Sequence, residues 1–250
     1  MIKIILGGCC GRMGRFVADI VKNRKDCDIV AGIDIVDDST LGFPVFQNYD
    51  EVKVDADVII DFSNPALLSS TLSYATANKV GLVLATTGLT DEQIAEVEKA
   101  AESIPVFFSY NYSMGVSLIC ELSKIAAKVL GNGFDVEIVE AHHNQKLDAP
   151  SGTAIMLGNA VKEELPDAYF EYDRHSKRQK RSGNEIGIHS IRGGTIVGEH
   201  SVMFAGNDEI VTISHSARSR AIFATGAVNA AVYLSDKENG MFNMSDLVNA

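Results

Sequence analysis

Short apolar runs alternate with segments of helical spacing through the first hundred residues of this chain. Ile2 to Leu6 is a run typical of a buried parallel strand, and apolar residues from Met13 to Val21 recur at helical spacing. The same patterns predict further strands at 28–34, 57–63, 81–87 and 104–109, a helix opening at Pro65, and a helix from a capping box at Thr90 to about residue 102. Such alternation predicts a parallel sheet with helices on both faces.

From Ser113 onward the pattern changes. A helix is expected at about 115–130, and a half-buried strand is expected to run from residue 134 to His142. A second helix is expected to begin at the N-cap Ser151. Strands at 185–190, 198–204 and 209–216 are expected to follow, and a final apolar helix at 220–234 could return to the first domain. We therefore expect an α/β chain in two domains. Residues 1–111 and 219–250 would form a doubly wound, Rossmann-type parallel sheet. Residues 112–218 would form an α+β domain with an open mixed sheet suited to substrate binding and oligomerisation.

The first predicted strand runs into a glycine-rich segment that indicates nucleotide binding. Gly8, Gly11 and Gly14 are spaced as G-x-x-G-x-x-G, a variant of the dinucleotide fingerprint. Gly8 would permit a tight turn, Gly11 a close approach of backbone to pyrophosphate, and Gly14 close packing of the helix. The motif alone is weak, but a strand precedes it and a helix follows.

Asp34 closes the second strand about twenty residues past the last glycine, where a carboxylate binds the adenosine ribose hydroxyls. Ile35 follows it in place of a basic residue that would favour a 2′-phosphate. We therefore expect NADH to be preferred and NADPH to be possible. Two loops at the carboxyl ends of later strands, 85–88 and 109–112, are candidates for the cofactor rim, although simple turns explain either loop alone.

The segment 137–154, EIVEAHHNQKLDAPSGTA, is the most informative in the chain. A strand would deliver His142, His143 and Lys146 to the N-terminus of the helix that Ser151 caps. Amide groups at a helix N-terminus bind carboxylate or phosphate, so these residues indicate an enzyme acting on a small anion. A metal site is not expected at the two histidines, because neighbours on a strand point to opposite faces and no cysteine lies nearby at zinc spacing.

Composition excludes several classes of partner. Lysine and arginine total 22 against 33 acidic residues, a net charge of −11, which argues against nucleic acid or an anionic membrane as partner. No apolar run could span a membrane, and Met1 leads directly into the first strand, so we expect a cytoplasmic protein. The four cysteines fit reduced thiols, with Cys9 and Cys10 as small loop residues whose oxidative sensitivity is a minor possibility. The basic run 174–181 is interpreted as a solvated loop, with a mobile flap over an anionic ligand as the alternative.

Nearly the whole chain resembles the 4-hydroxy-tetrahydrodipicolinate reductase (dihydrodipicolinate reductase) family of bacterial lysine and diaminopimelate synthesis. The resemblance is carried by GCCGRMG, DFS, ATTG, SYNYSMG, the segment 137–154, IRGGTIVGEHSVMF and SHSARSRAIFATGAVNAA. The segment around 142–153 is highly specific to that family, whereas the glycine loop is not. The resemblance implies a Rossmann domain completed by the C-terminal helix, a second domain for substrate and assembly, and a homotetramer.

By position, the resemblance implies catalytic roles for His142 and Lys146. It implies substrate binding by His143, Lys146, Gly152 and Thr153. The cofactor contacts that it implies come from Gly8, Cys9, Cys10, Gly11, Arg12, Met13, Asp34, Ala85, Thr86, Thr87, Ser109, Tyr110, Asn111 and Tyr112. The chain departs from the family at Cys9 and Cys10, where small residues are usual, at Tyr110, where proline is common, and at Ile35, which replaces the basic residue of dual-specificity members.

The implied reaction is reduction of a cyclic imine dicarboxylate by hydride from nicotinamide, after which His142 or Lys146 supplies a proton. Two alternatives remain. One is another nicotinamide-dependent dehydrogenase of amino-acid biosynthesis, such as an aspartate-semialdehyde or homoserine enzyme, although the Lys146 segment has no thiol for acyl-enzyme chemistry. The other is a non-catalytic nucleotide sensor, which would need no proton donor.

Overall fold

The computed structural model describes residues 1–36 and 38–250, which divide into two compact units. The first unit comprises Met1–Met114 and Ala221–Ala250, and the second comprises Gly115–Arg220. The chain crosses from one unit to the other between residues 114 and 115, and again between residues 220 and 221. The sequence analysis placed these two crossings between residues 111 and 112 and between residues 218 and 219.

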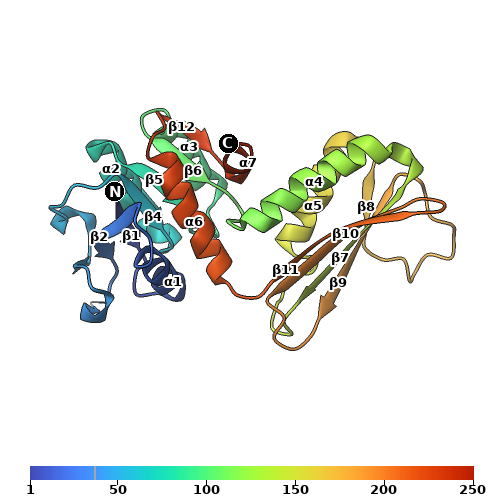
Figure 1. The fold of residues 1–250 in the computed structure, drawn as a ribbon, viewed down its shortest axis with the longest axis horizontal. Coiled ribbons are helices and arrows are strands. Elements are labelled where there is room, and N and C mark those ends of the chain that lie inside the picture. Colours follow the sequence, from blue (N-terminus) through green and yellow to red (C-terminus); the bar gives the residue numbers. More distant parts are fainter. Residues whose placement is uncertain (37) are drawn as a thin grey trace. The chain divides into compact units, whose positions relative to one another are not determined.

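The described residues of the first unit form a seven-stranded sheet in the order β12-β6-β5-β4-β1-β2-β3, with every neighbouring pair parallel (Figure 1). Its strands are β1 (Ile2–Gly7), β2 (Cys27–Ile33), β3 (Val45–Phe46), β4 (Val58–Asp61), β5 (Gly81–Leu84), β6 (Pro105–Phe108) and β12 (Gly240–Phe242). The predicted doubly wound parallel sheet is confirmed. The edge strands β3 and β12 were not predicted, because two or three residues show no periodicity.

Helices cover both faces of this sheet. They are α1 (Arg12–Val21), α2 (Leu68–Asn78), α3 (Asp91–Ala101), α6 (Ala221–Leu234) and α7 (Met244–Val248), with short 3-10 turns η1 (Ser39–Leu41), η2 (Tyr49–Glu51) and η3 (Pro65–Leu67). Successive residues of a strand face opposite ways. Ile4 accordingly joins the core beneath α1 and α6, and Ile5 joins the core beneath α2 and α3.

The C-terminal helix α6 fits this sheet because most of its buried residues are small. A Cβ on Gly226 would lie 1.6 Å from the Tyr112 carbonyl oxygen, so only glycine allows that approach. The predicted capping box at Thr90 is confirmed, since Thr90 and Gln93 exchange both hydrogen bonds at the start of α3. Pro65 opens η3 rather than α2 itself, and Asn64 caps that turn.

The second unit holds a five-stranded mixed sheet in the order β11-β10-β7-β9-β8. Its elements are α4 (Met114–Leu130), whose first residue belongs to the first unit, η4 (Gly131–Gly133), β7 (Asp135–His142), α5 (Gly152–Glu164), β8 (Tyr169–Glu171), β9 (Glu185–Arg192), β10 (Gly198–Ala205) and β11 (Ile210–Ala217). Strand β7 pairs parallel with β9 and antiparallel with β10, which confirms the predicted mixed sheet.

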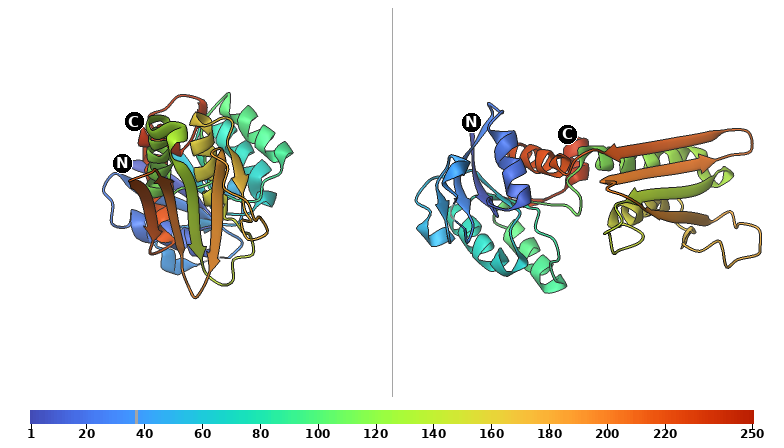
Figure 2. Two further views of the ribbon diagram at one scale, coloured as in Figure 1. Left: turned by 90° about the vertical axis from the view of Figure 1, so that its right-hand side faces the viewer. Right: turned by 90° about the horizontal axis from the view of Figure 1, so that it is seen from below.

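Both long helices of this unit, α4 and α5, lie on one side of its sheet (Figure 2). Every second residue of β7 is buried, including Val136 and Ile138, which pack against Ile119 of α4 and Leu157 of α5. The opposite face carries no helix of the described chain. The sheet is therefore open on one side, as the sequence predicted.

Candidate active site

The glycine loop after β1 has the close backbone contacts that its sequence predicts. Gly8 has φ +70°, and a Cβ there would lie 2.6 Å from the Phe62 carbonyl oxygen. A Cβ on Gly14 would lie 2.3 Å from the Gly8 carbonyl oxygen, so α1 can begin against the loop only because residue 14 is glycine. Gly11 is the N-cap of α1. The loop therefore presents backbone at a helix N-terminus, the arrangement that binds phosphate.

Asp34, at the end of β2, lies directly against this loop. Its Oδ2 atom accepts a hydrogen bond from the backbone N–H of Cys10 at 2.9 Å, and its Oδ1 atom accepts one from Val36 at 3.3 Å. Because β1 and β2 are parallel neighbours in register at Gly7 and Ile33, the two motifs reach the same edge of the sheet. The structure thus brings together the glycine loop and the carboxylate that the sequence predicted.

The two loop thiols differ in exposure. Cys9 is fully buried in the core, and burial, with neighbouring Cys10 and Asp34, raises its pKa to about 12. Cys10 is half-buried, and burial raises its pKa as well. Both thiols are therefore protonated at neutral pH, which disfavours their direct oxidation. A contact between Cys9 and a dinucleotide would have to come from its backbone, because its sulfur is buried beside that of Cys10, 3.8 Å away.

The two predicted rim loops follow β5 and β6, which pair at Leu84 and Phe108, so both leave the same edge of the sheet as the glycine loop. Tyr110 is exposed, and the Ser109 hydroxyl donates to the Asn111 carbonyl oxygen. Tyr112 is buried, and its hydroxyl donates to the carbonyl oxygen of Leu84 at 2.7 Å. The Tyr112 side chain therefore stabilises the fold rather than facing a cofactor.

A buried carboxyl group that the sequence analysis did not single out lies beneath this edge. Asp61, at the end of β4, accepts hydrogen bonds from the backbone of Ser63 and from the hydroxyl of Thr86. Burial raises the pKa of Asp61 despite these bonds. The Thr86 side chain, predicted to contact cofactor, is thus engaged with Asp61.

The predicted catalytic residues belong to the second unit, where β7 ends. Glu140 and His142 lie two residues apart, so both side chains face the helix-covered side of the sheet. His142 Nδ1 lies 2.6 Å from Glu140 Oε2, and the Glu140 side chain is completely buried. Glu140 was not among the predicted site residues, although its position two residues before His142 on the strand could have indicated it.

Glu140 is held by two further elements. Arg192, at the end of β9, donates to both its oxygens at 2.8 and 2.7 Å, and the backbone N–H of Ser151 donates to Oε1 at 3.1 Å. Burial opposes ionisation, but the bonds from Arg192, His142 and Ser151 outweigh it and lower the Glu140 pKa to about 2. An ionised carboxylate can only accept, so Nδ1 of His142 carries the hydrogen of their bond and Nε2 is the atom left for proton exchange.

His143 and Lys146 lie in the exposed connection after β7. The Lys146 ammonium pairs with Asp148 at 2.9 Å, and His143 Nε2 lies 3.5 Å from the Arg220 guanidinium. The backbone N–H of Asn144 donates to the Gly194 carbonyl, which ties this connection to the one between β9 and β10. Arg220 adds a cation to the cluster that the sequence analysis did not include.

Ser151 caps α5 as predicted, since its hydroxyl accepts a hydrogen bond from the backbone N–H of Ala154 at 3.2 Å. Gly152 and Thr153 are the first two residues of the helix, and a Cβ built on Gly152 would meet nothing within 4 Å. The structure therefore brings His142, the Glu140 carboxylate and an open helix N-terminus to one end of the second sheet.

His200, on β10, is a buried member of this cluster that the sequence analysis missed. Its ring lies 5.2 Å from the His142 ring, centroid to centroid, and its Nε2 atom lies 3.1 Å from the Ser151 hydroxyl. Burial, with the nearby His142, lowers the His200 pKa to about 4, so His200 is neutral at physiological pH. Only the pairing of β10 with β7 brings it here, which explains why sequence spacing gave no sign of it.

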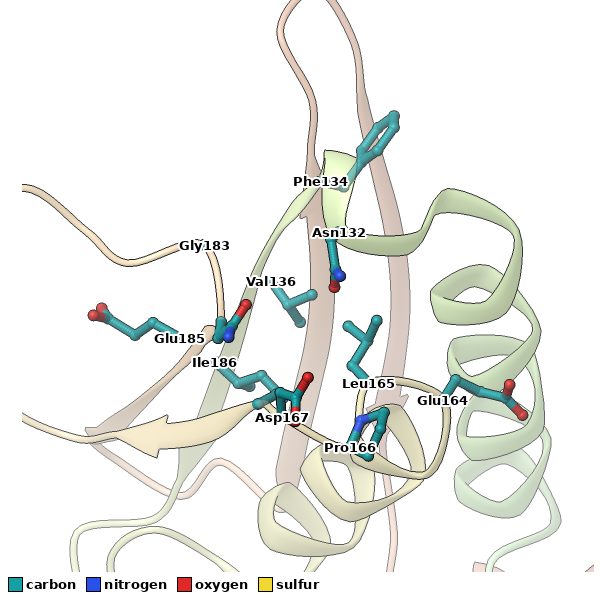
Figure 3. A pocket seen from close by; sticks show the side chains of 12 residues that line it. Asn132, Phe134, Val136, Glu164, Leu165, Pro166, Asp167, Gly183, Glu185 and Ile186 are labelled. Atoms are coloured by element: carbon teal, nitrogen blue, oxygen red, sulfur yellow. The ribbon is translucent and has the colours of Figure 1, made fainter.

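A hollow in the same unit lies away from this cluster. It is lined by Asn132, Phe134 and Val136 near the start of β7, and by Leu165 and Pro166 beyond α5 (Figure 3). His142 lies at the other end of β7 from Phe134 and Val136. The hollow contains none of the predicted site residues.

The basic run 174–181 is an irregular and mostly exposed segment, as expected of a solvated loop, but three of its cations are paired. Arg174 pairs with Glu185 at 2.9 Å, Lys177 with Glu171, and Arg181 with Asp135 at 2.7 Å. Arg181 also donates to the carbonyl oxygen of Val136. The run is therefore a solvated loop that three of its cations attach to the sheet.

The class of protein follows from these two units. The first unit has a doubly wound sheet, a glycine loop and an acidic residue at the end of a strand. The second unit carries a cluster of histidine and lysine side chains. Together these features define a two-domain oxidoreductase of Rossmann type. Among the described residues, no helix is both long and apolar enough to span a bilayer.

Comparisons with known proteins identify the family. The description "Dihydrodipicolinate reductase, N-terminus" matches residues 2–112, and "Dihydrodipicolinate reductase, C-terminus" matches residues 115–248. The chain is 48% identical over 249 residues to the 4-hydroxy-tetrahydrodipicolinate reductase of Caldanaerobacter subterraneus subsp. tengcongensis, covering 99% of this chain and 98% of that one. It is 47% identical over 249 residues to the protein of the same name from Clostridium novyi, with the same coverage.

Among solved structures, a dipicolinate-bound dihydrodipicolinate reductase from Paenisporosarcina sp. TG-14 matches with a TM-score of 0.81 and 28% identity, covering 97% of each chain. The chain therefore belongs to the dihydrodipicolinate reductase family, and the resemblance found in its sequence is confirmed.

Proposed function

We propose that this chain is a 4-hydroxy-tetrahydrodipicolinate reductase, which reduces a cyclic imine dicarboxylate to tetrahydrodipicolinate in diaminopimelate and lysine synthesis. One observation carries the proposal: an ionised, buried Glu140 orients His142 beside the helix N-terminus at Gly152, within the segment 137–154 that carries the family resemblance. Consumption of NADH that depends on the cyclic imine, measured with purified protein, tests it directly.

A nicotinamide dinucleotide supplies the hydride when it is bound to the first unit. The backbone of residues 8–13 would hold its pyrophosphate, and Asp34 its adenosine ribose. The rim loops 85–87 and 109–112 would complete the contacts. The positive φ of Gly8 and the exposure of Gly11 and Arg12 support this assignment.

NADH is the proposed preferred donor. Asp34 would repel a 2′-phosphate, and Arg15 of α1 is already paired with Asp38 at 2.6 Å. The Ile35 side chain, which is 80% exposed, offers a phosphate no charge. The ratio of kcat/KM values for NADH and NADPH tests the preference, and a larger value for NADPH would overturn it.

The substrate carboxylates would be bound by Lys146, His143 and the first amides of α5 at Gly152 and Thr153. Cations and helix N-terminal amides both favour an anion at this position. The open space above Gly152 allows a ligand to approach the backbone. The relative from Paenisporosarcina is described as bound to dipicolinate, a dicarboxylate of this class.

The proton that follows hydride transfer is assigned to His142 or Lys146. Glu140 fixes His142 through Nδ1, which leaves Nε2 to exchange a proton with the substrate or with Lys146. A Cβ on Gly198 would lie only 3.2 Å from Nε2, so the glycine keeps this nitrogen accessible. Such a general acid contributes about 10²–10⁴-fold to the rate.

The open face of the second sheet is the proposed assembly surface of a homotetramer. Ser201 of β10 and Ser214 of β11 face the helix-free side and bond to each other at 2.9 Å. Met203 lies on the same side of β10. The small and apolar side chains on this face suit packing against a second copy, and Glu137 and Glu199 on the same face already have partners within the chain. Sedimentation equilibrium tests this proposal, and a monomer at micromolar concentration would contradict it.

A further inference from the structure

Two thiols and a carboxylate gather beside the glycine loop in an arrangement that the proposed reduction does not use. One donor atom from each of Cys9, Cys10 and Asp34 lies within 4.8 Å of the other two. The Sγ atoms of Cys9 and Cys10 are 3.8 Å apart. No other group of this kind occurs in residues 1–36 and 38–250. The cluster combines the ligand types that bind zinc.

The sulfur separation matches tetrahedral coordination. Zinc–thiolate bonds are about 2.3 Å long, so two thiolates on one tetrahedral zinc ion lie about 3.8 Å apart. Cys9 and Cys10 already have this separation, and a metal ion would replace the hydrogen bond that the Cys10 thiol donates to the Val36 carbonyl oxygen.

Neighbouring groups hold each ligand in place. Asp34 is oriented by the backbone N–H groups of Cys10 and Val36. The Cys9 sulfur packs on Gly32, where a Cβ would lie 2.6 Å from Sγ. Cys10 is half-buried, so an ion from solvent can reach its side chain. Such outer contacts increase metal affinity by fixing the ligands.

We propose that Cys9, Cys10 and Asp34 form a zinc site whose occupation blocks dinucleotide binding. On binding, two S–H bonds break, two Zn–S bonds form, and two protons leave to solvent with no change of oxidation state. The block rests on the proposed function, since Asp34 would otherwise bind the ribose. A zinc-bound Asp34 cannot accept the ribose hydroxyls, and the ion fills the space beside the loop.

The first experiment measures metal binding alone. Full-length protein is reduced with a phosphine, freed of metal, and titrated with Zn²⁺ against a chromophoric chelator. We expect one equivalent bound in the wild type, and affinity weakened more than about 100-fold in Cys10→Ser and in Asp34→Asn, because losing even an outer contact costs about 10–100-fold. Cys120→Ala, which removes a thiol of the second unit, should bind as the wild type does. Equal affinity in wild type and Cys10→Ser would overturn the site.

Cd²⁺ provides a spectroscopic check that does not depend on activity. Coordination by thiolates produces an ultraviolet charge-transfer band, which should saturate at one Cd²⁺ per wild-type chain and be reduced in Cys10→Ser. A full-strength band in Cys10→Ser would also overturn the site. Circular dichroism of each variant shows whether it has folded, and Cys10→Ala serves as the second variant if Cys10→Ser has not.

The second experiment measures the block. NADH affinity is followed by NADH fluorescence with and without one equivalent of Zn²⁺. We expect the Kd to rise at least tenfold in the wild type and in Cys120→Ala, and to be insensitive to Zn²⁺ in Cys10→Ser. Zinc binding without a change in NADH affinity would overturn the block. Absence of NADH binding in metal-free wild type would instead contradict the proposed function, while the zinc titration would still decide the site.

Discussion

Glu140 and His142 form a buried carboxylate–imidazole pair, with Oε2 of one 2.6 Å from Nδ1 of the other. The pair is fixed by Arg192 from a neighbouring strand and by Ser151 at the start of α5. The carboxylate therefore sets which ring nitrogen carries the hydrogen, and this control can be tested by substitution.

Glu140→Gln should lower kcat at least about 10²-fold while the KM for NADH stays within about twofold. The amide can donate to Nδ1, which places the hydrogen on the wrong nitrogen, and it leaves Arg192 without its carboxylate partner. Steady-state kinetics measure both constants. Glu137→Gln is the matched control, because Glu137 lies on the same strand but pairs with His189 and Arg181 instead. An equal loss of activity in both variants would show a merely structural effect.

His142→Ala and Lys146→Ala should each lower kcat about 10²–10⁴-fold, the contribution of a general acid. Neither residue belongs to the unit with the glycine loop, so the NADH dissociation constant should remain unchanged. Kinetics and NADH fluorescence titration check the two parts. The exposed Lys128, on α4, supplies the control variant Lys128→Ala. Loss of NADH binding in either site variant would contradict this division of labour.

Asp61→Asn should stabilise the first unit at neutral pH. Burial raises the Asp61 pKa, so the folded state favours the protonated carboxyl, and the associated stability is present in acid and lost as pH rises through that pKa. A neutral amide avoids that loss. We expect Tm to rise near neutral pH and the difference to disappear in acid. Calorimetry at both pH values measures it, and a destabilised variant at neutral pH would refute the expectation.

His200 should make the second unit sensitive to acid. Its pKa is lowered to about 4 by burial, so the unfolded chain binds its proton first and stability falls as pH decreases from about 6.5 towards 4. The whole shift corresponds to about 3 kcal/mol. His200→Asn removes this titration and should flatten the decline of Tm over that range. Parallel slopes for variant and wild type would argue against it.

The sequence predicted the elements with strong periodicity and the groups that lie close along the chain. Strand β1, the helix cap at Ser151 and the pairing of the glycine loop with Asp34 could be predicted because each depends on local spacing or on the known geometry of parallel strands. Strand β12 could not, since a three-residue strand has no period and forms only where β6 offers a free edge.

The supporting residues of the site were missed for a related reason. Arg192 and His200 reach Glu140 and Ser151 only through strand pairing across more than 40 positions of sequence. The ion pairs of the solvated run 174–181 could not be predicted either, because their partners, Glu171, Glu185 and Asp135, come from three different strands. Local spacing predicts neither kind of contact.

Transfer of label from NADH to the cyclic imine tests the central claim most directly. With NADH that carries deuterium at the transferable position, the account predicts tetrahydrodipicolinate with one deuterium, formed by the wild type and at a strongly reduced rate by His142→Ala. Product mass spectrometry measures both. Oxidation of NADH without deuterium in the product, or undiminished turnover by His142→Ala, would contradict the account.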